Sequence, residues 1–148
     1  MSLERICNKS VVTVSRDATV LEAANLMRSK HIGCVVIVQD SRPVGILTDR
    51  DIVLEVVASA KKPAETAVRE IMTANLTTIN VNYDVLDAAR LMRSRGVRRL
   101  PLVDEHRRLI GIITMDDVLT ALGAEIGDLA AAVQKELGLE AATPVAMG

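Results

Sequence analysis

The chain has 148 residues, of which 49% are apolar and 25% charged, and this balance is typical of a soluble globular protein with a hydrophobic core. Its 18 basic and 19 acidic residues give a net charge of -1, so we expect no nucleic-acid partner, because phosphate-neutralising proteins carry excess positive charge. A single tyrosine is the only aromatic residue, which argues against base stacking on aromatic side chains. The sequence shows neither an apolar run of transmembrane length nor a secretory signal, so we expect a cytoplasmic protein without membrane contact.

The two cysteines, Cys7 and Cys34, lie far apart and form no C-x-x-C motif. We expect each to be a small core residue in a reducing compartment. His31 is expected to end a helix and His106 to lie in a turn, where solvated or capping roles are commoner than catalysis. These four residues do not have the spacings of a zinc site, so we predict no bound metal.

An internal repeat organises the chain. Residues 20–29 (VLEAANLMRS) match residues 85–94 (VLDAARLMRS), and GILT at 45–48 matches GIIT at 111–114 after one inserted residue. The predicted domains are a first repeat at 3–58, a linker at 59–67, a second repeat at 68–122, and a C-terminal helix with a frayed tail at 123–148.

Both repeats predict the same β-α-β-β-α order. In the first, the predicted elements are a strand at 11–14, a helix that starts at the Thr19/Glu22 capping box, strands at 34–38 and 44–47, and a helix at 48–57. In the second, they are a strand at 76–79, a helix that starts after Asp84, strands at 100–103 and 109–113, and a helix at 114–122. The fold class is α/β (α+β), with the two repeats packed sheet against sheet around a pseudo-two-fold cleft, because one unit of about 55 residues is marginal alone.

Beyond the second repeat, residues 124–137 predict an amphipathic helix. Its apolar residues are Ile126, Leu129, Ala130, Val133 and Leu137. We expect this helix to dock either on this chain or on a partner, and we expect residues 141–148 to fray.

Motifs for catalysis are missing from the sequence: it has no G-x-S-x-G, no Walker A and no G-x-G-x-x-G. Asp116 and Asp117 could in principle hold a metal, but acidic residues also favour the start of a helix. We therefore expect a protein that is not an enzyme and requires no cofactor. An enzyme that turns over a nucleotide without any of these motifs stays an alternative.

The end of a strand recurs as residues 45–51 (GILTDRD) and 111–117 (GIITMDD). In each copy the Thr and the Asp three residues later could simply cap the next helix. The alternative is a ligand site, in which the Asp accepts hydrogen bonds from a ribose diol. The Thr hydroxyl and the N–H groups at the helix start would then receive a phosphate, and the Gly would let a base approach the backbone.

Two adjacent arginines, Arg98 and Arg99, precede a strand of the second repeat. They are either an exposed basic pair or a phosphate clamp, because the guanidinium group can make bidentate bonds. The first repeat has Gly33 and Cys34 near the equivalent place, so the two sites should differ. Arg50 is a further candidate for phosphate binding.

Together these features resemble the cystathionine-β-synthase (CBS) domain pair, or Bateman module. The resemblance extends from Leu3 to Leu122 and includes the Arg-Glu-Ile-Met-Thr segment at 69–73, the Ala-Ala-x-Leu-Met helices and the Gly-x-x-Thr-x-x-Asp strand ends. It implies a non-catalytic regulatory module that binds AMP, ADP, ATP or S-adenosylmethionine in the cleft and pairs into disc-shaped homodimers. A stand-alone, energy-sensing module of this kind would signal to a separate protein partner; the alternative is a structural or interaction module with degenerate sites.

The resemblance also implies roles for individual residues. The ribose-binding residues would be Asp51, Asp117, Thr48 and Thr114. The phosphate-binding residues would be Arg98, Arg99 and Arg50. The base pocket would be lined by Thr13, Val14, Ile32, Gly33, Cys34, Thr78, Ile79, Val97 and Pro101.

Overall fold

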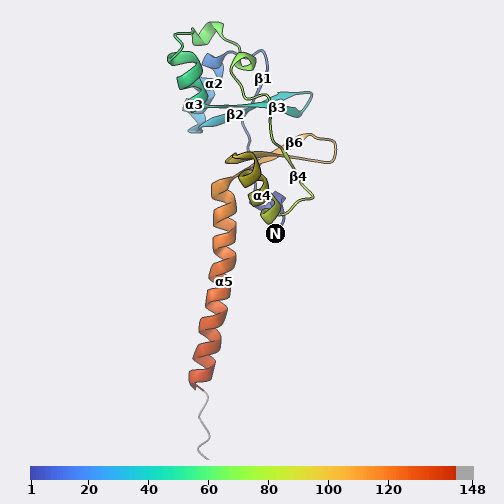
Figure 1. Cartoon of the computed structure of the whole chain (residues 1–148), viewed down its shortest axis with the longest axis vertical. Helices are drawn as coiled ribbons and strands as arrows, with labels where there is room; N and C mark the ends of the chain where they lie inside the picture. Colours follow the sequence, from blue (N-terminus) through green and yellow to red (C-terminus); the bar gives the residue numbers. More distant parts are fainter. Residues whose placement is uncertain (143–148) are drawn as a thin grey trace, which may run out of the picture.

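A computed structural model describes residues 1–142 as two similar α/β units followed by a long helix (Figure 1). The strands of the first sheet are β1 (Thr13–Ser15), β2 (Cys34–Gln39) and β3 (Arg42–Thr48), and those of the second are β4 (Ile79–Asn80), β5 (Arg99–Val103) and β6 (Leu109–Thr114). In each sheet the first two strands are parallel and the last two antiparallel. The predicted β-α-β-β-α order and the mixed α/β class are therefore confirmed for both repeats.

One long helix follows the first strand of each repeat; these helices are α2 (Val20–Lys30) and α4 (Val85–Arg95). The predicted capping box at α2 is present, since Thr19 Oγ1 accepts a hydrogen bond from Glu22 N at 3.1 Å and Glu22 Oε2 accepts one from Thr19 N at 2.9 Å. The helix ends at His31, which has a left-handed backbone (φ 54°), as Gly96 has after α4 (φ 65°). The predicted position of His31 at a helix end is thus confirmed.

The buried apolar residues form one cluster for each repeat, and each cluster takes its first segment from the other half of the sequence. Leu3, in α1 (Leu3–Ile6), is fully buried in the cluster of the second repeat. Val68, in the 3-10 helix η3 (Val68–Glu70), and Ile71 are buried in the cluster of the first repeat. The sequence repeat aligned these two lead-in segments with each other but did not predict the exchange.

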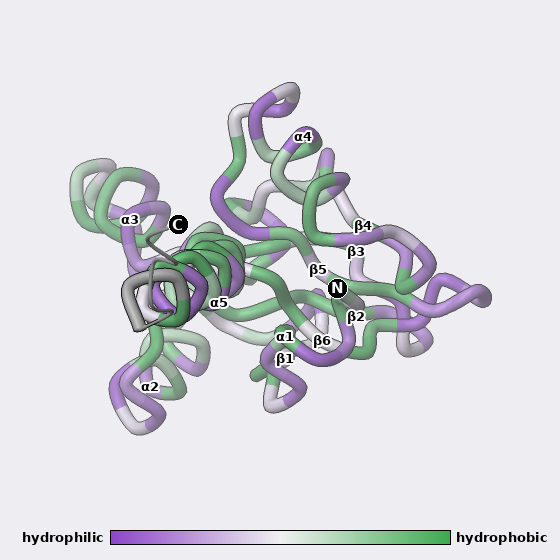
Figure 2. Tube along the Cα trace, turned by 90° about the horizontal axis from the view of Figure 1, so that it is seen from below, coloured by the Kyte–Doolittle hydropathy of each residue, from purple (hydrophilic) through white to green (hydrophobic). Residues whose placement is uncertain are grey.

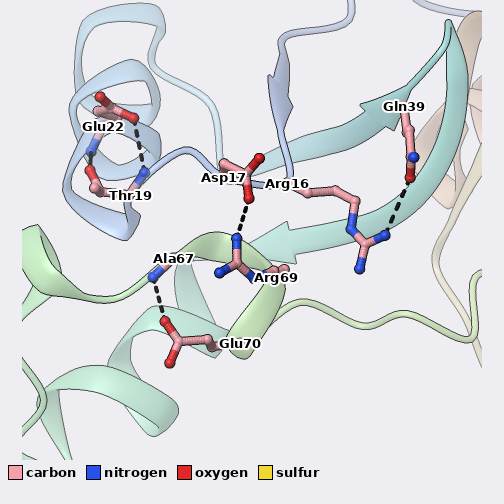
Figure 3. Close-up of polar contacts among 8 residues, drawn as sticks. All are labelled: Arg16, Asp17, Thr19, Glu22, Gln39, Ala67, Arg69 and Glu70. Atoms are coloured by element: carbon pink, nitrogen blue, oxygen red, sulfur yellow. Dashed lines mark hydrogen bonds and ion pairs between the residues drawn. The ribbon is translucent and has the colours of Figure 1, made fainter.

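Polar contacts hold the second lead-in segment on the first repeat (Figure 3). The Arg69 guanidinium pairs with the Asp17 carboxylate of the first repeat. Within the segment itself, Glu70 Oε2 accepts a hydrogen bond from Ala67 N at 2.6 Å and so caps η3. Backbone bonds continue the contact, with Val68 N donating to Ala18 O at 2.8 Å. The linker before this segment includes the short 3-10 helix η2 (Pro63–Glu65).

Two glycines allow the exchanged segments to approach the sheets. A Cβ atom on Gly45 would lie 2.4 Å from Met72 Sδ, and one on Gly111 would lie 2.8 Å from Cys7 Sγ. The sequence interpretation that these glycines admit a flat base is therefore wrong, because the space beside each is filled by the chain itself. Their role is close packing of one repeat's lead-in segment against the other repeat's third strand.

The opposite faces of the two sheets are also buried. Val35 and Ile37 point into the cluster beside α2, while Val36, between them, is fully buried on the other face of β2. Pro101 in β5 is buried as well. This burial fits two sheets that face each other, as the drawing of the chain indicates (Figure 1).

The last helix of each repeat differs from the prediction. In the first repeat, the predicted helix at 48–57 is a short α-helix, α3 (Asp49–Ile52), that continues as a π-helix, η1 (Val53–Val57). In the second, α5 (Met115–Ala142) runs for 28 residues without a break, so the predicted helix end at Leu122 is wrong. An interior glycine lowers helix propensity by only about 1 kcal/mol, and this did not stop α5 at Gly123.

The C-terminal half of α5 extends away from the rest of the chain (Figure 1). Residues 123–139 are all exposed, so the predicted docking of this segment on its own chain does not occur among the described residues. The predicted fraying at 141–148 falls mostly outside the described residues. Within residues 1–142, none of the helices combines the length and the low charge needed to cross a bilayer.

Candidate functional site

The repeated Thr and Asp residues form reciprocal helix caps. Thr48 N donates to Asp51 Oδ2 at 2.9 Å, and Asp51 N donates to Thr48 Oγ1 at 3.1 Å. The second repeat has the same pair of bonds between Thr114 and Asp117, at 2.8 and 3.2 Å. All four residues are half-buried. The capping interpretation of these motifs is therefore confirmed, and any ligand role would be additional to it.

The caps leave hydrogen-bonding capacity for a ligand. In both repeats the bonds that the Asp carboxylate receives go to Oδ2. An ionised carboxylate can accept at both oxygens, so Oδ1 can accept from a ligand hydroxyl without breaking the cap. The Thr hydroxyl accepts one bond and keeps its own proton to donate.

The backbone N–H groups at the helix starts are less available than the sequence suggested. Asp49 N donates to Gly33 O at 2.9 Å, and Met115 N donates to Arg98 O at 2.8 Å. These bonds attach the start of each last helix to the start of the second strand of its repeat. A phosphate at either site would consequently depend on side-chain cations more than on these helix N–H groups.

Two neighbouring hollows lie at the start of β5. The larger has a volume of about 220 Å³ and is lined by Ile46, Thr48, Thr73, Asn75, Leu76, Thr77, Val97, Arg98 and Arg99. The smaller has a volume of about 60 Å³ and is lined by Arg98, Arg99, Thr114, Met115 and Asp116. The structure thus brings both arginines together with Thr114, and it adds Thr48 from the first repeat.

Several of the predicted base-pocket residues lie elsewhere. Val14, Ile79 and Pro101 are buried; the alternating pattern of β1 and β4 points Val14 and Ile79 into the two core clusters. Thr13 is exposed on β1, and Thr78 and Ile79 border a separate hollow of about 490 Å³ beside α4. Ile32, Gly33 and Cys34 lie at the start of β2, half-buried, and only Val97 of the predicted set lines the hollow beside the arginines.

The remaining wall of that hollow comes from residues the sequence did not identify. Residues 73–77 contribute four of its side chains, from the segment just before β4. The only available signal was their place between the lead-in segment and the first strand of the repeat. Arg50, predicted to bind phosphate, is exposed on α3 and lines neither of the two hollows.

Electrostatics link the arginines to the first repeat. Burial raises the pKa of the Cys34 thiol, and the positive charge of Arg99 opposes this rise. Arg99 is therefore close enough to act on the start of β2, so a charge from the second repeat reaches the first repeat's site. Burial also raises the pKa of the Cys7 thiol. Both cysteines are half-buried thiols at neutral pH and thus poor nucleophiles.

The acidic residues of the site do not form a group of metal ligands within the described part of the chain. Across residues 1–142, no three His, Cys, Asp or Glu side chains come together as metal ligands would. Asp117 caps α5, while Asp116 is exposed in its first turn. A negative charge at that place stabilises a helix without any ion.

The fold is a tandem α/β module in which each repeat has a three-stranded sheet and a reciprocal Thr/Asp cap after its last strand. The family model for the CBS domain matches residues 3–58 and 68–124. This chain therefore belongs to the CBS domain family and contains a CBS domain pair.

Known proteins with similar sequences or structures vary in length. The protein MK0525 of Methanopyrus kandleri is 42% identical over 120 residues, which cover 80% of this chain and 61% of that protein. Inosine-5'-monophosphate dehydrogenase of Methanocaldococcus jannaschii is 37% identical over 117 residues, 78% of this chain but only 22% of the enzyme. The CBS domain pair of protein MJ0100, solved with 5'-methylthioadenosine and S-adenosyl-L-methionine, has a TM-score of 0.74 at 29% identity, covering 84% of this chain and 98% of that one.

Proposed function

We propose that this chain is a non-catalytic regulatory module that binds an adenosine-containing ligand beside Arg98 and Arg99 and signals to a protein partner in the cytoplasm. The observation that carries the proposal is the joint placement of these arginines and Thr114 around adjoining hollows. Such a module needs no cofactor for chemistry, because its output is a change of shape.

Each part of an adenine nucleotide has a matching group. The apolar side chains of Ile46, Leu76 and Val97 offer a surface for the adenine ring. Asp117 lines neither hollow, but it is bonded to Thr114, which lines the smaller one, and its Oδ1 can accept a bond from a ribose hydroxyl there. The arginines can bind phosphate oxygens. Because guanidinium groups favour phosphate, AMP, ADP or ATP should bind better than S-adenosylmethionine, whose sulfonium is positively charged.

The larger hollow, about 220 Å³, is below the roughly 300–1,000 Å³ of ordinary small-molecule sites. It shares Arg98 and Arg99 with the smaller hollow, so movement of these two side chains would join them. Binding would then favour the conformation in which the arginines are displaced, by no more than the ligand's difference in affinity for the two states. Ligand binding would in this way change how the two repeats are positioned relative to each other.

Two relatives support a regulatory role. The MJ0100 pair was solved with two adenosine-containing ligands, which makes such ligands the first to test here. In the dehydrogenase, the matching segment is a minor part of a longer enzyme. A CBS pair can therefore occur beside a catalytic region, and here we propose that the regulated activity belongs to a separate protein.

The test is isothermal titration of AMP, ATP, S-adenosylmethionine and 5'-methylthioadenosine into the wild-type chain, Asp117→Ala and Asp51→Ala/Asp117→Ala. We expect the wild type to bind at least one nucleotide and the variants to lose at least tenfold in affinity. The matched control is Asp87→Ala, because Asp87 Oδ2 accepts the same kind of bond (3.0 Å) at the start of α4, from Asp84 N. Asp84 lines neither hollow, whereas the capping partners of Asp51 and Asp117, which are Thr48 and Thr114, each line one of them. Unaltered binding by the double variant would remove the site assignment.

A second candidate is a structural or interaction module whose Thr/Asp pairs only cap helices. The capping bonds in both repeats favour it, because they give these residues a role that needs no ligand. A chain whose melting temperature is insensitive to all four adenosine compounds would support this candidate over the sensor.

A further inference from the structure

A separate hollow of the second repeat lies between β4 and α4, outside the nucleotide site. Its volume is about 490 Å³, within the range of roughly 300–1,000 Å³ that is usual for small-molecule sites. It shares no lining residue with the two hollows beside Arg98 and Arg99. In both views of the chain, β4 and α4 lie side by side (Figure 1, Figure 2). We call this space the α4 hollow.

One wall of the α4 hollow carries Tyr83, the only aromatic residue of the chain. Tyr83 is 54% exposed, although hydrogen bonds hold the backbone on either side of it. Before it, Asn80 O accepts a bond from Tyr83 N at 3.1 Å, and Asn80 Nδ2 donates to Asp104 O at 3.2 Å. After it, Asp84 caps α4. The ring therefore stands on an ordered stretch of backbone, which lowers the entropy cost of binding a flat group.

The helix wall of the α4 hollow is positively charged. Arg90 and Arg93 line it, and its acidic lining residue, Asp87, already has partners. Asp87 Oδ2 accepts a bond from Asp84 N at 3.0 Å, and Asp87 Oδ1 pairs with Arg90 Nη1 at 3.3 Å. A guanidinium group has several N–H donors, so Arg90 keeps donors for a ligand. Among the described residues, no carboxylate pairs with Arg93. This charge favours an anionic ligand.

The α4 hollow also offers apolar contacts. Ile79 and Leu91 line it together with Tyr83, and both belong to the core of the second repeat or pack against it. Figure 2 shows hydrophobic and hydrophilic residues alternating along α4. A flat ring against these side chains would leave water, while a charged group on that ring could reach the arginines. Small-molecule sites typically combine apolar surface with a few polar or charged groups in this way.

The first repeat lacks the groups that would bind such a ligand. When residues 20–29 are aligned with 85–94, Arg90 corresponds to Asn25, and Tyr83, just before the aligned stretch, corresponds to Ala18. The first repeat forms the same strand and helix without a tyrosine or an arginine at these places. The ring and the charge are therefore not needed for the fold, and a ligand gives them a role.

We propose that the α4 hollow binds a small organic anion, whose flat ring rests against Tyr83 and whose carboxylate or phosphate group binds Arg90 and Arg93. Both anionic groups present two or more oxygens that match the fork of a guanidinium group. This site would be independent of the nucleotide site, because the two share no residue. Failure of either proposal would leave the other untouched.

The test uses the single tyrosine as its reporter. The full chain, labelled with fluorotyrosine, has one fluorine NMR signal, from Tyr83. The probes are phenyl phosphate, benzoate and inorganic phosphate. We expect a saturable shift of the signal with at least one of the two probes that carry a ring. Inorganic phosphate should bind at least tenfold more weakly, and Arg90→Gln/Arg93→Gln should weaken the ring-bearing probe at least tenfold.

The matched control is Arg28→Gln/Lys30→Gln, which removes two positive charges from exposed positions of α2, the equivalent helix of the first repeat. It should bind the probes as wild type does, and circular dichroism should show the same helix content in both double variants. The absence of a saturable shift with either ring-bearing probe would overturn the proposal. Equal weakening in the two double variants would also overturn it, because net charge alone would then explain binding. Inorganic phosphate that binds as tightly as phenyl phosphate would refute the role of Tyr83.

Discussion

The two repeats of this chain share a fold but differ where a ligand would bind. Both have a capped first helix, the same strand order and a reciprocal Thr/Asp cap with matching distances. At the start of the second strand, the first repeat has Gly33 and Cys34, and the second has Arg98 and Arg99. The shared residues build the unit, and the residues that differ mean that the second repeat supplies both arginines, which lie beside Thr48 of the first repeat and Thr114 of the second.

The repeats also depend on each other for their cores. Each lead-in segment packs on the opposite repeat, with Leu3 in the second cluster and Val68 in the first. Neither repeat is therefore a complete domain on its own, and a change in one lead-in segment should affect the other repeat's stability.

The largest predicted effect tests this exchange. Leu3→Ala should lower the free energy of unfolding by about 2–5 kcal/mol, because it leaves a cavity in the second repeat's core. Leu21→Ala, at an exposed position of α2, is the control and should change it by less than about 0.5 kcal/mol. Urea unfolding measures both, and a loss below about 1 kcal/mol for Leu3→Ala would contradict the exchanged packing.

The next prediction compares the two packing glycines. Gly111→Ala should cost about 1–3 kcal/mol, because its Cβ would press on the short Cys7 side chain. Gly45→Ala should cost less, since its main obstacle is the flexible Met72 thioether. Removing Cys7 Sγ in Gly111→Ala/Cys7→Ala should recover part of the loss in thermal unfolding. If the stability losses of Gly111→Ala and Cys7→Ala simply add in the double variant, contact with Cys7 is not the cause of the Gly111→Ala loss.

The third prediction is that the Thr48 cap and the Thr114 cap contribute equally to stability. Thr48→Ala and Thr114→Ala should each lower stability by about 1 kcal/mol, because each removes the acceptor for one helix N–H. Chemical denaturation of the two variants should give losses within a few tenths of a kcal/mol of each other. A Thr114→Ala variant as stable as wild type would contradict the capping geometry at α5.

The smallest prediction concerns pH and a turn found in this form only in the second repeat. Burial acts to raise the pKa of Asp104, but hydrogen bonds from Arg108 and His106 outweigh it and hold that pKa below its ordinary value. A lowered folded-state pKa gives stability that is present above the unfolded Asp value and lost as pH falls through the folded value. The difference in melting temperature between wild type and Asp104→Asn should therefore shrink as acid is added. A difference that stays constant down to pH 2 would contradict this account.

Most of the architecture could be predicted from the sequence because it is locally encoded. The Thr19 box, the alternating strands and the duplicated pattern each follow from spacing, and each is present. The exchange of Leu3 and Val68 could not be predicted, because a repeat shows which residues are equivalent and not which core they join. The unbroken α5 was missed because the prediction ended the helix with the second repeat, at Leu122, and treated 124–137 as a separate helix. The helix continues through Gly123, where an interior glycine costs only about 1 kcal/mol.

The site was less predictable than the fold. The Thr and Asp residues after the last strand of each repeat were identified by their motif, and in the structure they cap the following helix. Val14 and Ile79 were assigned to a pocket although strand alternation points them into the core. The wall formed by residues 73–77 has no motif, since it depends on how the two repeats face each other.

The central claim is that Arg98 and Arg99 make the second repeat a phosphate-dependent adenosine site, and one titration tests it most directly. AMP and adenosine would be titrated into the wild-type chain and into Arg98→Gly/Arg99→Cys, which gives the second repeat the residues of the first. Bonds between guanidinium and phosphate contribute about 1.5–3 kcal/mol, so the wild type should prefer AMP over adenosine by about 10–100-fold. The variant should bind both about equally, and a preference for AMP that survives the double substitution would contradict the account.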